Sequence, residues 1–98
     1  MRVGSRWKST VDTTEVMVIR GPSGDVDLRC GGHPMVTTAT SGGNTLDPAF
    51  ADGTQVGKRY VDESIGLEVL CSKGGPGSLA VADRPLALRE AKPLPTSD

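Results

Sequence analysis

Residues 3–24, VGSRWKSTVDTTEVMVIRGPSG, return in altered form as residues 56–77, VGKRYVDESIGLEVLCSKGGPG. The two stretches align without a gap over 22 positions, at a constant offset of 53 residues. The residues identical to their counterparts in the second stretch are Val3, Gly4, Arg6, Glu15, Val16, Gly21 and Gly24. An ungapped internal match of this kind predicts a duplicated structural module.

The match continues beyond the glycine-rich segments and divides the chain into four parts. LRCGGHPMV at 28–36 aligns with LAVADRPLA at 79–87, where the offset is 51 residues. We therefore assign residues 1–36 and 55–88 to two repeats, residues 37–54 to a polar connector, and residues 89–98 to an extended C-terminal arm.

The composition favours short strands over helices. The 98 residues include 13 Gly and 7 Pro, and only 36% are hydrophobic. Residues 14–19 (TEVMVI) and 67–70 (LEVL) are typical of strands, and each precedes a glycine-rich turn at 21–24 or 74–77. Second strands at 26–29 and 79–81 would complete a hairpin in each half.

Each repeat is too short to bury a sufficient core alone. The expected fold is therefore all-β, with two small hairpin modules packed as a pseudo-twofold dimer in one domain.

Each half resembles desulforedoxin, a small iron-binding module that also forms the N-terminal part of desulfoferrodoxins. The second half follows that pattern at Gly57, Tyr60, Gly66, the 74–77 turn, Leu79, Pro85 and Leu86. The first half follows it at Gly4, Trp7, the 21–24 turn, Leu28, Cys30, Gly32 and Met35. The resemblance implies two desulforedoxin-like repeats.

The resemblance also implies where metal ligands would lie, and the chain departs from the family there. Four thiolates hold the metal in such a site. The corresponding residues are Ser9, Asp12, Cys30 and Gly31 in the first half, and Asp62, Ile65, Val81 and Ala82 in the second. Because one thiol remains, we expect degenerate metal sites and no cofactor. Apolar Ile65, Val81 and Ala82 predict a small hydrophobic core in place of the second site.

A residual site remains as an alternative. Asp12, Cys30 and His33 are weak candidates for metal ligands, since Cys30 and His33 have the spacing of half a zinc knuckle. Cys30 and Cys71 together could form a thiol sensor or a disulfide, although a chain without a signal peptide favours reduced thiols. The competing interpretation is a buried thiol near a surface histidine.

Basic residues recur in both halves, at Arg6, Arg20, Lys58, Arg59 and Lys73. They could face an acidic partner or form cross-strand ion pairs with Glu15 and Glu68, and we favour the ion pairs. Glu15 and Glu68 themselves are expected to be charges on the strand surface.

Charge and hydropathy exclude several classes of function. The net charge of −1 argues against nucleic-acid binding, and no apolar run approaches the length that spans a membrane. The N-terminal segment does not look like a signal peptide, which predicts a cytoplasmic protein. We expect no enzyme activity, but a non-catalytic accessory or small subunit that binds a larger protein, an enzyme. Homo-oligomerisation is left open.

Overall fold

The computed structural model describes residues 2–22, 24–38 and 43–89. Within these residues the regular elements are short β-strands, apart from one 3-10 turn at Pro48–Phe50. The all-β prediction is therefore confirmed. No helix long and apolar enough to cross a bilayer occurs in the part of the chain that the structure describes.

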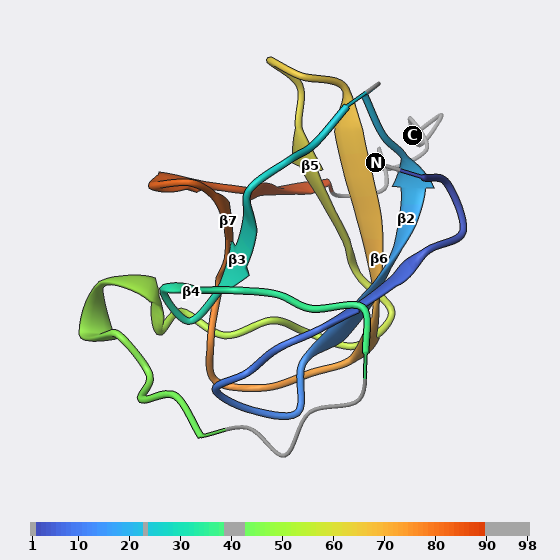
Figure 1. Cartoon of the computed structure of the whole chain (residues 1–98). Helices are drawn as coiled ribbons and strands as arrows, with labels where there is room; N and C mark the ends of the chain where they lie inside the picture. The colour runs from blue at the N-terminus through green and yellow to red at the C-terminus, as the bar shows by residue number, and fades with distance from the viewer. Residues whose placement is uncertain (1, 23, 39–42, 90–98) are drawn as a thin grey trace, which may run out of the picture.

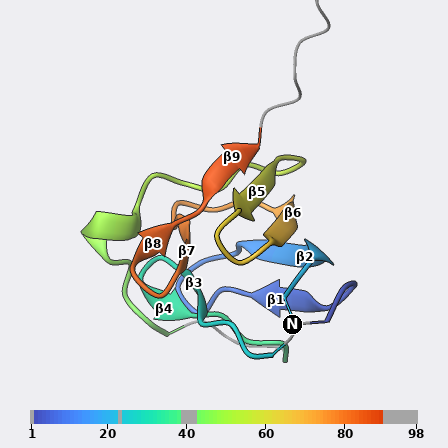
Figure 2. The same cartoon turned by 90° about the horizontal axis from the view of Figure 1, so that it is seen from above.

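The strands form two antiparallel sheets, which face each other in Figure 2. The large sheet has the order β1 (Arg6–Lys8), β2 (Glu15–Arg20), β6 (Leu67–Lys73), β5 (Arg59–Asp62) and β9 (Ala87–Arg89). The small sheet has the order β4 (His33–Pro34), β3 (Leu28–Cys30), β7 (Leu79–Val81) and β8 (Arg84–Pro85). Figure 1 shows β2 and β6 side by side, with β3 and β7 opposite them.

Both sheets contain strands from both halves of the sequence. The central pair of the large sheet is β2 with β6, in which Met17 lies opposite Leu70. The central pair of the small sheet is β3 with β7, in which Arg29 lies opposite Ala80. Neither sheet is complete without both halves, so the chain folds as a single compact globule.

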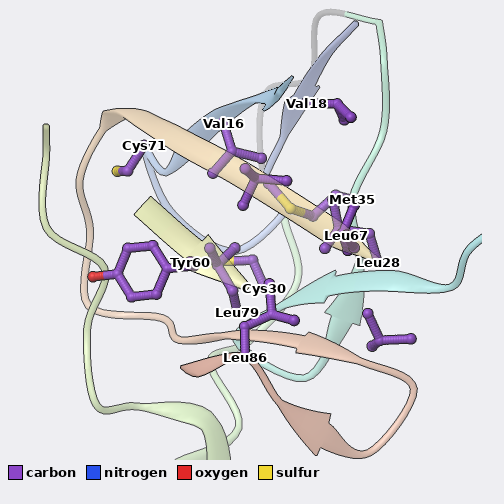
Figure 3. Packing of buried hydrophobic residues seen from close by; sticks show 12 residues of the cluster. Val16, Val18, Leu28, Cys30, Met35, Tyr60, Leu67, Cys71, Leu79 and Leu86 are labelled. Carbon is purple, nitrogen blue, oxygen red and sulfur yellow. The ribbon is translucent and has the colours of Figure 1, made fainter. Parts of the chain in front are cut away.

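The core fills the space between the two sheets, as Figure 3 shows. It contains the residues of β2, β5 and β6 that point inward and those of β3 and β7 that face them, together with Met35 and Leu86: Val16, Val18, Leu28, Cys30, Tyr60, Leu67, Val69, Cys71, Leu79 and Val81. Trp7, Val26 and Ile65 pack against this cluster from its margin. Burial alternates along β3, as the period of a half-exposed sheet requires, whereas all three residues of β7 are buried.

The predicted hairpins across the glycine-rich segments are wrong. β2 pairs with β1 and β6, and β3 pairs with β4 and β7, so β2 and β3 belong to different sheets. Because both edges of β2 are occupied, the chain after Arg20 cannot turn back beside it. The chain instead passes from the large sheet to the small one between β2 and β3, and again between β6 and β7. The hairpins that do form are β1–β2, β3–β4, β5–β6 and β7–β8.

Several element boundaries differ from the sequence prediction. Strand β7 has the predicted bounds, whereas β6 runs on to Lys73 and β3 begins two residues later than expected. Arg89, assigned to the extended arm, is the last residue of β9. The rest of the arm, residues 90–98, lies outside the described residues.

The described part of the connector contacts both halves. The Asp47 N–H donates to the Gly31 carbonyl at 3.0 Å, and the Ser78 N–H donates to the Phe50 carbonyl at 2.8 Å. Thr54 forms a pair of backbone hydrogen bonds with Gly75. Residues 43–54 are therefore part of the packed structure.

Candidate functional site

The loop between β1 and β2 places the Asp12 carboxylate between the two halves of the chain. Its Oδ1 accepts a hydrogen bond from the Thr14 N–H at 3.0 Å. Its Oδ2 accepts one from the Gly77 N–H at 2.7 Å, across 65 residues of sequence. The carboxylate therefore connects the first half to the glycine-rich segment of the second.

Ser9 and Thr14 surround this carboxylate with buried hydroxyl groups. The Ser9 hydroxyl accepts hydrogen bonds from the N–H groups of Val11 and Asp12, which fixes the turn of the loop. The Thr14 hydroxyl lies close enough to lower the pKa of Asp12, yet it has no partner at hydrogen-bond geometry. A buried hydroxyl without a partner is uncommon in folded proteins.

Cys30 completes the cluster from β3, and its thiol is fully buried. The thiol donates a long hydrogen bond to Asp12 Oδ1, at 4.0 Å. Burial and then the negative charge of Asp12 raise the pKa of Cys30 to about 11. The thiol therefore keeps its proton at neutral pH, although Thr14 and Ser9 act in the opposite direction.

Asp12 itself remains ionised. Burial acts to raise the pKa of Asp12, but the hydrogen bonds from Thr14 and Gly77 together outweigh it, so the pKa lies below its ordinary value. The cluster thus consists of a charged acceptor and a protonated thiol.

Two glycines of the second half pack directly against the cluster. A Cβ at Gly75 would lie 2.5 Å from Thr14 Oγ1 and 2.7 Å from Asp12 Oδ2. A Cβ at Gly77 would lie 2.9 Å from Asp12 Oδ2 and 3.1 Å from Cys30 Sγ. Only glycine allows the backbone to approach this closely. These close contacts leave little room around the carboxylate for a bound group.

Of the three weak metal-ligand candidates, the structure brings Asp12 and Cys30 together and leaves His33 apart. His33 lies opposite Cys30 in the β3–β4 pair, but its Nε2 is 3.0 Å from the Thr45 carbonyl oxygen. Across residues 2–22, 24–38 and 43–89, no three His, Cys, Asp or Glu side chains are grouped so that they could hold a metal ion.

The metal that the family resemblance implies does not fit the residues present. Among the four first-half positions, Cys30 alone carries sulfur, and its pKa of about 11 opposes the thiolate that a metal requires. Both carboxylate oxygens of Asp12 already accept N–H groups. A tetrahedral thiolate cage has no counterpart here.

In the second half the corresponding positions have different environments. Val81 is buried and Ile65 packs against the core, as predicted. Ala82, by contrast, is exposed in the β7–β8 turn, where its φ of 54° is left-handed. Asp62 accepts hydrogen bonds from Ser64 and pairs with Arg84 at 3.0 Å. The predicted hydrophobic replacement therefore includes two of the three apolar positions.

Cys71 is also buried, in β6, near enough to Asp12 and Cys30 to interact electrostatically with both. Its thiol donates to the Lys73 carbonyl at 3.1 Å, and burial raises its pKa. Both cysteines are free, so the disulfide that the sequence left open is absent.

Glu15 and Glu68 are buried, although the sequence predicted surface charges. Glu68 is 5% exposed and pairs with Arg59 at 3.7 Å and with Arg89. Glu15 is 8% exposed and pairs with Lys8 at 3.6 Å. The predicted cross-strand pairing is thus found for Arg59, while Lys8 and Arg89 are partners that the sequence did not indicate.

A groove of about 560 Å³ is lined by residues of β5 and the turn that follows it, of β8 and of β9. Apolar lining residues are Val61, Pro85, Ala87 and Leu88, and the Asp62–Arg84 ion pair lies among them. Nothing in the sequence indicated this groove, because residues far apart in the chain form it.

Comparison with known proteins finds no matching family model, no matching curated protein and no matching solved structure.

Proposed function

We propose that this chain is a non-catalytic accessory subunit that binds a larger protein, an enzyme, through a metal-free scaffold of two desulforedoxin-like modules. The observation that carries the proposal is the Asp12 cluster. At the position of a metal ligand it has a carboxylate that already accepts two backbone N–H groups, one from each half. The hydrogen bonds of Asp12 connect the two halves. They would replace the stabilisation that a bound metal gives to each module of the family.

The strand registers support two copies of one module related by a pseudo-twofold axis. The pair Arg6–Met17 has a counterpart 53 residues later in Arg59–Leu70. Each central pair joins a residue to its own repeat counterpart, Met17 to Leu70 and Arg29 to Ala80. If a twofold axis relates the halves, strands that meet at the axis must pair each residue with its own counterpart. A chance similarity between the halves would not require this pairing.

The environment of the two thiols supports a role without catalysis. A nucleophilic cysteine needs a lowered pKa and access to solvent. Cys30 and Cys71 are at most 1% exposed, and both have raised pKa values. The proposal places the protein in the cytoplasm, where unpaired thiols persist.

The alternative is a residual metal or redox site on Cys30, as an electron-transfer or thiol-sensor protein. One observation favours it, because the unpartnered Thr14 hydroxyl lies beside Cys30 and Asp12. The raised pKa of Cys30 opposes it.

Native mass spectrometry of the chain isolated gently from its host separates these functions. The accessory role predicts a stoichiometric complex with a larger protein and no added metal mass. Added mass equal to iron or zinc, lost in Cys30→Ser, would support the alternative. A bare chain with neither would contradict the accessory role and the metal-bound form of the alternative. The thiol-sensor form instead predicts a loss of about two hydrogens in mass on mild oxidation, reversed by a reductant.

A further inference from the structure

One face of the large sheet carries a row of basic and apolar residues across all five strands. Register partners in an antiparallel sheet point to the same side. Trp7, Val16, Val69 and Tyr60 line the core side. Their chain neighbours therefore point away from the core, and one row of register partners contains Arg6, Met17, Leu70, Arg59 and Arg89. We call this side the outer face.

Basic side chains dominate the outer face. It carries Arg6, Lys8, Arg59 and Arg89, and Arg20 and Lys73 border it at the ends of β2 and β6, opposite Glu68 and Glu15. Six of the chain's 11 Lys and Arg residues thus gather here, against the two glutamates. This excess of four positive charges occurs in a chain of net charge −1, so the two signs are segregated on the molecule.

The basic side chains of the outer face are more exposed than its glutamates, which increases the excess of positive charge at the surface. The Glu15 and Glu68 side chains are 11% and 6% exposed, whereas those of Lys8, Arg59 and Arg89 are 40%, 57% and 53% exposed. Arg6, Arg20 and Lys73 are exposed, and no acidic residue in the described ranges forms an ion pair with them. The charge that this face exposes to solvent is therefore mainly positive, because the two glutamates are largely buried.

The centre of the same row is apolar. Met17 and Leu70 lie opposite each other on the two central strands, and both are half-buried. An apolar centre within an arginine-containing polar rim is the common composition of protein interfaces. Rim charges of one sign steer and orient a partner of the opposite sign.

We propose that the outer face of the large sheet is the docking surface for a carboxylate-rich patch of a partner protein. The inference rests on the proposed accessory function and names the surface and the chemistry of the partner. The apolar Met17–Leu70 centre and the acidic remainder of the chain favour a protein over a nucleic acid. Five strands at sheet spacing span about 20 Å, which is small for an interface, so charge should dominate the affinity.

The first test uses labelled poly-L-glutamate as the probe and fluorescence anisotropy at low and physiological salt. The variant is Arg6→Gln/Arg20→Gln on the outer face. Its control is Arg29→Gln/Arg84→Gln on the small sheet, which removes the same charge from residues that pair with Asp27 and Asp62. We expect the outer-face variant to bind about fivefold more weakly, and the control to change by less than about twofold.

Three results would overturn the proposal. The first is that the unaltered chain shows no salt-sensitive binding to polyglutamate. The second is that both variants lose the same affinity, and the third is that the unaltered chain binds an oligo(dT) strand of equal charge more tightly than polyglutamate. The last result would assign the face to nucleic acid.

The second test repeats native mass spectrometry from the host with the same two variants. Loss of the larger protein in the outer-face variant alone supports the proposal. Its retention by both variants contradicts this docking surface but leaves the accessory function intact. Absence of any larger protein from the unaltered chain contradicts the accessory function itself, and the polyglutamate result then decides the surface separately.

Discussion

The Asp12 carboxylate accepts a 2.7 Å hydrogen bond from the backbone N–H of Gly77, which lies 65 residues further along the chain. Replacing Asp12 with Ala would leave this N–H and that of Thr14 without their acceptor in a partly buried site. We expect the free energy of unfolding to fall by about 2–4 kcal/mol. Two hydrogen bonds to a charged group would contribute about 1.5–3 kcal/mol each, and partial exposure of the site reduces their sum. Urea denaturation measures the change.

Asp52→Ala is the matched control, since Asp52 is exposed in the connector and should change the free energy by less than about 0.5 kcal/mol. Asp12→Asn should lie between the two, because an amide presents one acceptor oxygen where the carboxylate presents two. Equal stability of Asp12→Ala and Asp52→Ala would show that the carboxylate does not hold the halves together.

The lowered pKa of Asp12 predicts a loss of stability in acid. A carboxyl group with a folded-state pKa below its unfolded value stabilises the fold above the unfolded pKa. That contribution disappears as the pH falls from the unfolded value of 3.8 through the lower folded value. The free energy of unfolding, measured between pH 6 and pH 2, should therefore fall less steeply in Asp12→Asn.

The pKa of Asp62 is also lowered, first by the Ser64 hydroxyl, so Asp12→Asn should remove only part of the acid dependence. The double variant Asp12→Asn/Asp62→Asn should remove more of it. An Asp12→Asn profile parallel to that of the unaltered chain would contradict the assignment.

Both thiols should resist alkylation in the folded protein. Thiolate is the reactive form, and the pKa of Cys30 is about 11 with no exposed surface. At pH 8 in native buffer, labelling by a thiol reagent should be slower by orders of magnitude than in denaturant, where both cysteines should react. The single variants Cys30→Ser and Cys71→Ser identify which thiol reacts. Rapid native labelling of Cys30 would instead support the thiol-sensor alternative.

The all-β class could be predicted because the glycine and proline content excludes long helices and short β-type runs recur at a fixed offset. The pairing of those runs could not be predicted in the same way. A glycine-rich segment after a strand permits either a hairpin or a change of sheet. The outcome depended on β1 and β6 occupying both edges of β2, which is a non-local fact.

The candidate site was predicted in part for the same reason. Asp12 and Cys30 were named from a family pattern, and the β1–β2 loop and β3 do bring them together. Gly77 was assigned only to a turn, since no local signal shows that its N–H meets a carboxylate of the other half. Burial of Glu15 and Glu68 was also hidden, because Lys8 reaches Glu15 from the neighbouring strand and Arg89 reaches Glu68 across β5.

Ala82 adopts a left-handed backbone conformation, with a φ of 54°, in the exposed β7–β8 turn. Gly31, its counterpart 51 residues earlier, has a φ of 63°, so the turn requires this conformation in both halves. An L-residue loses roughly 1–2 kcal/mol there, and glycine avoids that loss at an entropic cost of roughly 0.5–1 kcal/mol. We therefore expect Ala82→Gly to raise the free energy of unfolding by about 0.5–1 kcal/mol, seen as a higher Tm. Ala51→Gly is the control, because Ala51 has a φ of −121° and gains no relief of strain. It should be neutral or slightly destabilising, and the same response in both variants would contradict the assigned strain at Ala82.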